Sequence, residues 1–285
     1  MDNVSADFEH EIPNGSKLYF GKTARLKREI ENYASEIFNK YDFQEILTPY
    51  FSYHQRLSVS PDKLLKISDP INKEVAIRGD STIDVVRILR RRLKDESLKR
   101  LFYIQPIFRY PSEEVYQIGA ELIGENNLAM CIKIVGEILA EFGLKPKLQL
   151  SNLQIVEAVC KELDLDIKNF EYGKIDKIFA QKCDWLDALA SLSDIADLEN
   201  VFDLVPQSIK KPLRDLGNLA EICTNFELCL SPLYYSKMRY YDKLFFRFFD
   251  DNEILCNGGD YEIDEQDSSG FALLTDSVIK KIVEK

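Results

Sequence analysis

Residues 100–126 read RLFYIQPIFRYPSEEVYQIGAELIGEN and decide the fold. The run at 101–110 is rich in aromatic and β-branched residues, which favour a strand with a buried face. Residues 111–114, PSEE, interrupt that run and predict a turn. Residues 115–123 then alternate, with Tyr116 and Ile118 on one side and Gln117 and Glu121 on the other. The stretch therefore predicts a β-hairpin.

One face of this hairpin carries candidate binding residues. Arg109 stands at the exit of the first strand, and Gln117 and Glu121 share a face of the second. A cation, an amide and a carboxylate on a rigid platform suit a pocket for a small polar molecule. The alternative, which this stretch alone leaves open, is an ordinary half-solvated hairpin.

Composition and charge argue against several classes of protein. The chain has 285 residues, of which 45% are hydrophobic and 30% charged, as in an ordinary folded protein. Its net charge of -11 argues against long-range attraction to nucleic acid or anionic lipid. The six cysteines form no CxxC pair, so neither a zinc site nor a disulfide framework is expected. Because the sequence carries no secretory signal and no membrane-spanning run, we expect a cytoplasmic protein.

The rest of the chain predicts an α+β fold, in which an antiparallel sheet is flanked by helices. Periodic apolar residues predict helices at 22–41, 83–93 and 128–142. Strands are expected at 43–49, 74–77, 145–150, 228–232, 238–249 and 253–256, with a turn at 257–261. The pattern of residues 151–225 is helical, and it predicts a subdomain inserted between core segments 1–150 and 226–285.

Two local predictions concern single residues. Asp80 or Ser81 is a candidate N-cap of the helix at 83–93. Alternation along the strand at 238–249 places Tyr240 and Tyr241 on opposite faces.

The order of these elements resembles the catalytic core of a class II aminoacyl-tRNA synthetase, and specifically the histidyl enzyme. The first helix with FQEILTP, ending at Pro49, resembles motif 1, the dimer-forming element. RGDST at 78–82 resembles the segment R-P-(E/D)-x-T, in which the acidic residue holds the amino group of histidine. Further resemblances are FR at 108–109 with YQIGAELIG at 116–124 (motif 2), the pair Tyr240-Tyr241, GGDYE at 258–262 (GGRYD), and GFAL at 270–273 (motif 3).

Departures from the synthetase pattern argue against catalysis. The motif 2 loop is cut to about residues 111–115, and Ser277 stands where motif 3 has an arginine. Ser236 occupies the position of the arginine before the paired tyrosines, and Lys237 that of a glycine. Adenylate formation depends on cations set against phosphate charge, so we expect no enzyme activity. Because the sequence stops after motif 3, neither an anticodon-binding domain nor tRNA binding is expected.

The same truncation and lost arginines are found in regulatory subunits of ATP phosphoribosyltransferase, histidyl-synthetase paralogues of histidine biosynthesis. The resemblance implies a non-catalytic regulatory subunit without cofactor or metal. It would form a homodimer through motif 1 and join the short catalytic subunit in a hetero-oligomer. It also implies a pocket for L-histidine, with α-amino contacts from Asp80 and Thr82, carboxylate-side contacts from Arg109 and Gln117, and imidazole contacts from Glu121 and Tyr240 or Tyr241. A carboxylate facing the imidazole N–H would form a charge-assisted hydrogen bond.

Two alternatives stay open. The first is a synthetase-like enzyme that activates an amino acid for a non-tRNA acceptor; Ser236 and Ser277 argue against the ATP site it needs. The second is a scaffold whose pocket has decayed. Gly79 in place of the family proline and Asp260 in place of the arginine of GGRYD favour this reading.

Overall fold

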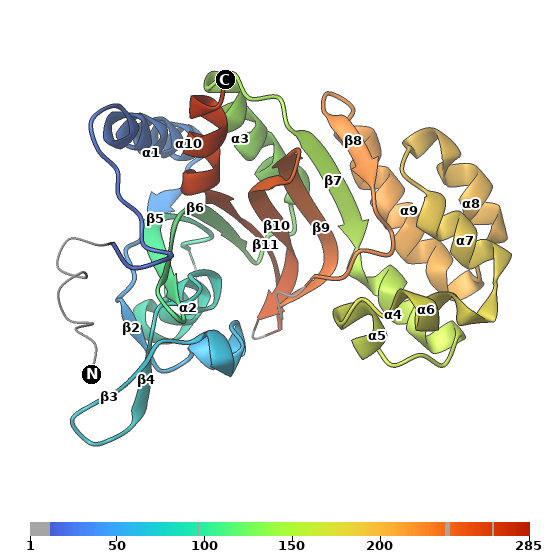
Figure 1. Cartoon of the computed structure of the whole chain (residues 1–285), viewed down its shortest axis with the longest axis horizontal. Coiled ribbons are helices and arrows are strands. Elements are labelled where there is room, and N and C mark those ends of the chain that lie inside the picture. Colours follow the sequence, from blue (N-terminus) through green and yellow to red (C-terminus); the bar gives the residue numbers. More distant parts are fainter. Residues whose placement is uncertain (1–11, 96, 237–239, 264) are drawn as a thin grey trace, which may run out of the picture.

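The computed structural model describes residues 12–95, 97–236, 240–263 and 265–285. Its main element is a mixed eight-stranded sheet (Figure 1). In order across the sheet the strands are β1 (Gln44–Glu45), β5 (Arg100–Arg109), β6 (Glu113–Ile123), β11 (Gln266–Leu274), β10 (Glu253–Ile263), β9 (Tyr241–Asp250), β7 (Lys147–Asn152) and β8 (Glu227–Leu230). The strands from β5 to β7 in this order pair antiparallel.

The two edge pairs, β1 with β5 and β7 with β8, are parallel. Parallel neighbours cannot be joined by a tight hairpin and need a crossover connection. The helical segment between β7 and β8 supplies one crossover. The segment between β1 and β5 supplies the other. The α+β class is therefore confirmed, whereas the prediction of a wholly antiparallel sheet is wrong at both edges.

Helices cover both faces of the sheet (Figure 1). On one face, α1 (Lys22–Lys40), α3 (Leu128–Glu141) and α10 (Thr275–Val283) contribute to the larger apolar core. On the other face lies α2 (Thr82–Arg87), which continues as a π-helical turn at Ile88–Leu93. A three-stranded sheet precedes α2 and has the order β2 (Phe51–Ser52), β4 (Glu74–Ile77) and β3 (Lys66–Ser68).

A block of helices connects β7 to β8 at one side of the molecule (Figure 1). Its α-helices are α4 (Leu153–Glu162), α5 (Lys168–Glu171), α6 (Ile175–Ile178), α7 (Asp184–Ser191), α8 (Leu198–Leu204) and α9 (Gln207–Ile222). Short 3-10 turns lie at Gln55–Leu57, Pro61–Lys63, Phe179–Gln181 and Ile195–Asp197. The helical pattern expected for residues 151–225 is present. The division into segments 1–150, 151–225 and 226–285 stays a prediction.

Several local predictions need correction. The strand expected at 43–49 is reduced to Gln44–Glu45, because the chain leaves the sheet edge before Thr48-Pro49. The turn expected at 257–261 is instead the middle of β10, where a glycine pair lets the strand pass close to large side chains. β9 begins at Tyr241; positions 238 and 239 of the predicted strand lie outside the described residues.

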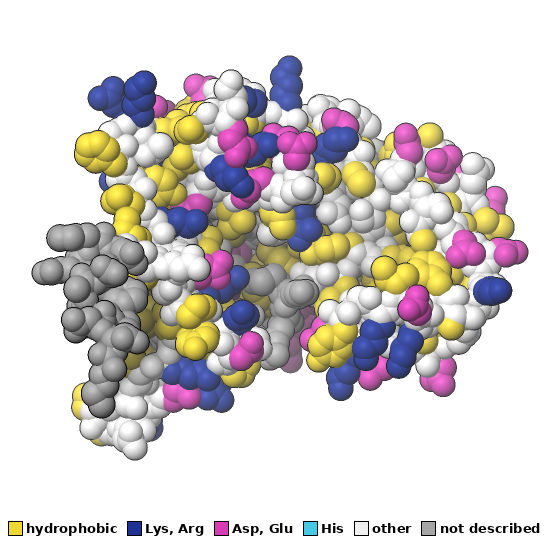
Figure 2. Space-filling view, in the orientation of Figure 1, with side chains coloured by type: hydrophobic (Ala, Val, Ile, Leu, Met, Phe, Trp, Pro, Cys, Tyr) yellow, Lys and Arg dark blue, Asp and Glu magenta, His cyan; other side chains and the backbone are white. Residues whose placement is uncertain are grey.

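The surface is mixed in charge. Lys and Arg side chains lie interspersed with Asp and Glu over the face shown in Figure 2. On this face the acidic side chains are not gathered into a single patch.

Candidate functional site

The β5–β6 hairpin is the platform of the candidate site. Its register places Arg109 opposite Glu113, and Gln117 and Glu121 follow Glu113 along β6 at even spacing. Because side chains alternate with a period of two, Arg109, Gln117 and Glu121 share one face of the sheet. The predicted hairpin and the shared face are confirmed.

Glu121 is a fully buried carboxyl group on this face, with 0% exposure. Its Oε2 accepts a hydrogen bond from the Tyr261 hydroxyl at 2.7 Å, and its Oε1 accepts one from Tyr103 at 3.3 Å. Burial raises the pKa of Glu121 to about 8, although the hydroxyl donors lower it. With this pKa, Glu121 is largely protonated at neutral pH. A positively charged ligand beside it would favour its ionised form.

Asp80 stands between β4 and α2 and is 4% exposed. Its Oδ1 accepts a long hydrogen bond of 3.4 Å from the Tyr240 hydroxyl. Its Oδ2 has no hydrogen-bond partner among the described residues. Burial raises the pKa of Asp80 to about 6, against the opposing charge of Arg109. A buried acceptor without a donor is costly, so Oδ2 is a place where an N–H group of a ligand would bind.

Gln55 holds the segment that carries Asp80. Its Oε1 accepts from the backbone N–H of Gly79 at 2.7 Å and of Asp80 at 2.8 Å. Its Nε2 donates to the Asp80 carbonyl at 3.0 Å and to Oδ2 of Asp84 at 2.6 Å. Proline, which the family pattern has at this position, could not donate the first of these bonds. Gly79 therefore contributes a donor that helps to order the segment.

Arg78 ties the same segment to the sheet and is 1% exposed. Its Nε and Nη2 donate to the Pro106 carbonyl at 2.9 and 2.7 Å. Its Nη1 donates to the Thr48 carbonyl at 2.8 Å and to Oε1 of Gln105 at 3.0 Å. The guanidinium thus bonds to backbone and amide oxygens of the protein itself. These bonds anchor to the sheet the segment that carries Asp80.

Arg109 and Gln117 differ in their hydrogen bonds to the rest of the protein. Nε of Arg109 donates to the Gly79 carbonyl at 3.2 Å, and the side chain is half-buried. Gln117 is 6% exposed, and its Oε1 has no hydrogen-bond partner within the described parts of the chain. Together with Oδ2 of Asp80, the site therefore offers two buried acceptors to a ligand that donates hydrogen bonds.

The paired tyrosines have different surroundings. The Tyr240 hydroxyl lies 3.4 Å from Oδ1 of Asp80 and 3.5 Å from Oγ1 of Thr82. A hydrogen bond with Thr82 also lowers the pKa of Glu121, so these polar groups form one network. Tyr241 is 8% exposed, and its ring packs 4.6 Å from that of Tyr240.

The prediction that strand alternation separates Tyr240 from Tyr241 is wrong. Both rings pack with the apolar cluster that contains Tyr261. The physical reason is that Tyr240 precedes β9, so the period of a strand does not govern its direction.

Three residues that line or support the site were missed in the sequence. Tyr103 and Arg109 lie an even number of positions apart along β5, so the period of two of a strand could have placed Tyr103 on the same face. Tyr261 lies within GGDYE, so the resemblance of this segment to GGRYD could have marked it. Gln55 lies in an irregular segment, and nothing in its neighbourhood in the sequence signals its contacts.

The positions of the missing arginines carry no positive charge. Ser277 is 9% exposed, and its hydroxyl donates to Oε1 of Glu253 at 2.5 Å. Ser236 is buried, and Lys237 lies outside the described residues. Neither serine can replace the charge of an arginine against phosphate.

Asp260 does not face the candidate site. It lies opposite Ser269 on β11, which in turn lies opposite Leu122 on β6. Leu122 is adjacent to Glu121, and adjacent residues of a strand point to opposite faces. The change from GGRYD to GGDYE therefore alters the other face of the sheet and leaves the pocket around Glu121 untouched.

Comparison with known proteins adds evidence at the level of the whole chain. The family model described as histidyl-tRNA synthetase matches residues 19–278. The ATP phosphoribosyltransferase regulatory subunit of Wolinella succinogenes is 44% identical over 278 residues, which are 96% of each chain. The protein of the same name from Helicobacter hepaticus is 38% identical over 95% of this chain and 98% of its own.

A solved structure shares the fold. The crystal structure of an ATP phosphoribosyltransferase regulatory subunit/histidyl-tRNA synthetase from Bacillus halodurans is similar with a TM-score of 0.83 at 21% identity. The match covers 96% of this chain and 84% of that one. In the part of the chain that the structure describes, no helix is both long and apolar enough to span a membrane.

Proposed function

Because the chain belongs to the histidyl-tRNA synthetase family and, within it, to the ATP phosphoribosyltransferase regulatory subunits, we propose that it serves histidine biosynthesis as a non-catalytic subunit of that enzyme. It acts by binding the catalytic subunit. The serines at positions 236 and 277 support the absence of adenylation, because ATP activation needs cations at these places. Its cytoplasmic location stays a prediction.

The ligand of the site is L-histidine. The observation that carries this proposal is the buried Oδ2 of Asp80, to which no described residue donates, beside a fully buried Glu121. Asp80 and Thr82 receive the α-ammonium group, and Arg109 receives the α-carboxylate. Glu121 accepts from the imidazole N–H, and Tyr240 contacts the ring.

The structural contacts favour one change within this scheme. Gln117, which the resemblance puts on the carboxylate side, has a buried Oε1 that accepts no hydrogen bond from the described residues. An acceptor suits an ammonium better than a carboxylate, because two acceptors repel each other. Gln117 is therefore assigned to the α-ammonium group. Tyr241 supports the Tyr240 ring without touching the ligand.

Calorimetric titration with L-histidine, and separately with ATP, tests the proposal. Histidine binding is expected in the wild-type protein and is expected to disappear in Asp80→Ala. Asp62→Asn, a change of an exposed aspartate, is the control and should bind normally. Binding of histidine that survives Asp80→Ala would refute the assigned pocket. ATP–pyrophosphate exchange above background would refute the non-catalytic role and favour a synthetase-like enzyme.

The partners are the catalytic subunit and a second copy of this chain. The segment after β1 begins within motif 1, which ends at Pro49, and continues beyond it. It exposes large apolar side chains: Leu47 is 72% exposed, Tyr50 52%, Phe51 59% and Tyr53 59%. Neighbouring exposed apolar residues of this kind mark interaction surfaces. A homodimer through this segment would cover them. Co-purification with the short catalytic subunit tests the second partnership, and its failure with both purified proteins would refute it.

A further inference from the structure

A second polar hollow lies where the helical block meets the sheet. It has a volume of about 560 Å³ and is bounded by the beginnings of α3 and α4, the length of α9, β9 and β10. This volume is within the roughly 300–1,000 Å³ typical of small-molecule sites. Asp260 lines the hollow, and because Asp260 and Glu121 point to opposite faces, the hollow is separate from the candidate histidine pocket.

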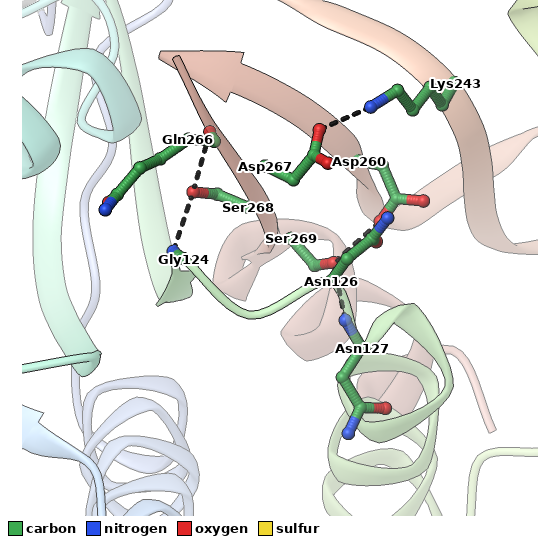
Figure 3. Close-up of polar contacts among 9 residues, drawn as sticks. All are labelled: Gly124, Asn126, Asn127, Lys243, Asp260, Gln266, Asp267, Ser268 and Ser269. Carbon is green, nitrogen blue, oxygen red and sulfur yellow. Dashed lines mark hydrogen bonds and ion pairs between the residues drawn. The ribbon is translucent and has the colours of Figure 1, made fainter. Parts of the chain in front are cut away.

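Asp260 is held in a fixed polar cluster (Figure 3). Its Oδ1 accepts from the Ser269 hydroxyl at 2.6 Å. With its amide nitrogen turned toward the carboxylate, Asn126 donates to Oδ1 at 2.7 Å and to Oδ2 at 3.1 Å. The backbone N–H of Asn127 donates to the Ser269 hydroxyl at 3.0 Å, which fixes the cluster at the start of α3. Asp260 is 2% exposed, so this carboxylate is pre-oriented.

The walls of the hollow combine amides with apolar side chains. Gln154 at the start of α4 and Asn218 on α9 line it with carboxamides. Leu219 and Ile222 contribute apolar surface, and Ile222 is 66% exposed. Lys211 lies on the same helix, about two turns before Leu219 and three before Ile222. Its exposed ammonium group pairs at 3.3 Å with Asp215, which also lines the hollow.

From this arrangement we infer that the hollow around Asp260 binds a purine nucleoside 5′-phosphate. A carboxylate accepts hydrogen bonds from ribose hydroxyls, and carboxamides match the donor and acceptor edge of adenine. Leu219 and Ile222 offer apolar contact to the base. Lys211 exchanges its ion pair with Asp215 for one with the phosphate, to which it presents a point charge. The inference is independent of the proposed function, because it uses the other face of the sheet.

Titration calorimetry of the full chain with AMP, 2′-deoxy-AMP and ribose 5-phosphate tests this site. AMP is expected to bind, and 2′-deoxy-AMP to bind at least roughly tenfold more weakly if a hydroxyl bond to the carboxylate is lost. Asp260→Asn keeps the shape of the side chain and should weaken AMP binding by a similar factor. Ile222→Glu alters only an exposed wall residue and should also weaken it, which guards against misfolding of the first variant.

Arg109→Met and Asp80→Asn are the matched controls on the opposite face, and both should leave AMP binding unchanged. AMP binding that is lost in Arg109→Met but kept in Asp260→Asn would overturn the inference and place the nucleotide on the histidine-pocket face. Equal affinity for AMP and 2′-deoxy-AMP would overturn the role of Asp260. The absence of AMP binding to the wild-type chain would overturn the site as a whole, whatever the outcome of the histidine titration.

Discussion

The Tyr261 hydroxyl donates to Oε2 of Glu121 over 2.7 Å, although the two residues lie on different strands and 140 positions apart. β11 lies between these strands, and the residue it places opposite Glu121 is Gly270. A Cβ atom at Gly270 would lie 1.9 Å from Oε2. Because Gly270 has no side chain, the Tyr261 hydroxyl and the Glu121 carboxyl group can approach each other across β11.

Glu121 should make stability depend on pH. Its pKa is about 8 in the folded chain, above the usual value of 4.5, so the folded state holds this proton more tightly than the unfolded state. Its contribution is complete below about pH 4.5 and is lost as pH rises through about 8. Between pH 6 and 8 we expect the free energy of unfolding to fall by up to about 1.4 kcal/mol per pH unit.

Urea denaturation at pH 6, 7 and 8 without histidine measures this effect. Glu121→Gln, which is permanently neutral, should remove most of the slope. Glu199→Gln, at an exposed position of α8, should keep it. Parallel slopes for wild type and Glu121→Gln would contradict the assignment.

Histidine affinity should rise with pH over a similar range. Asp80, with a pKa of about 6, and Glu121, with one of about 8, both become ionised as pH increases. The α-ammonium group keeps its charge over this range, so its attraction to Asp80 grows. The ligand's imidazole becomes neutral at about pH 6.5 but still donates an N–H to the ionised Glu121. Calorimetry at pH 5.5, 6.5 and 7.5 should show a falling Kd. An affinity independent of pH would argue that the ligand's ammonium group does not reach Asp80.

Gly270→Ala should be strongly destabilising, because the new methyl group collides with Oε2 of Glu121. Overpacking of this kind costs about 1–3 kcal/mol. Glu121→Ala removes the colliding atoms, so the double variant should lose less than the sum of the two single variants. Thermal or urea unfolding of the four proteins measures this coupling. Additive losses would show that the collision is relieved elsewhere.

Gly79→Pro should destabilise the chain more than Gly79→Ala does. Both add a side chain within 3.3 Å of Leu64, but only proline removes the N–H that donates to Gln55 at 2.7 Å. Losing that donor in a buried site costs about 1–3 kcal/mol. The difference between the two variants in urea denaturation combines the loss of this hydrogen bond with the limits that the proline ring sets on its own φ and on the backbone of Arg78. Equal stability would mean that Gln55 does not hold the segment.

Leu47→Glu combined with Phe51→Glu should convert the proposed homodimer to monomer. These side chains are 72% and 59% exposed in a single chain, and charges there would be buried at the interface. Light scattering should show half the mass of the wild type. Tyr172→Glu, at a residue of the helical block that is 64% exposed, should leave the mass unchanged. A monomeric wild-type protein would contradict the proposal.

Much of the fold follows from local pattern. Alternation in residues 115–123 placed Gln117 and Glu121 on one face, and the register of the hairpin confirms it. Apolar periodicity located the first helix to within one residue of its end at Lys40. Such patterns succeed because the period of a strand or helix is a property of the backbone alone.

Local pattern failed where distant segments meet. The glycines at 258–259 predicted a turn, yet they lie inside β10 because Phe246 and Tyr241 of the neighbouring strand fill the space above them. The direction of Tyr240 also departed from alternation, since that residue precedes its strand.

The sequence by itself determined the α+β class, the hairpin, and the set of polar residues that resembles a histidine pocket. Only the tertiary structure decided which residues contact one another. It brings the hydroxyls of Tyr261 and Tyr103 to Glu121, and it holds the Asp80 segment through Gln55. It also places Asp260 on the opposite face of the sheet. The physical reason is that burial and cross-strand register depend on contacts between residues far apart in the chain. The pKa of Glu121 changes for the same reason, because it reflects the surroundings that folding creates.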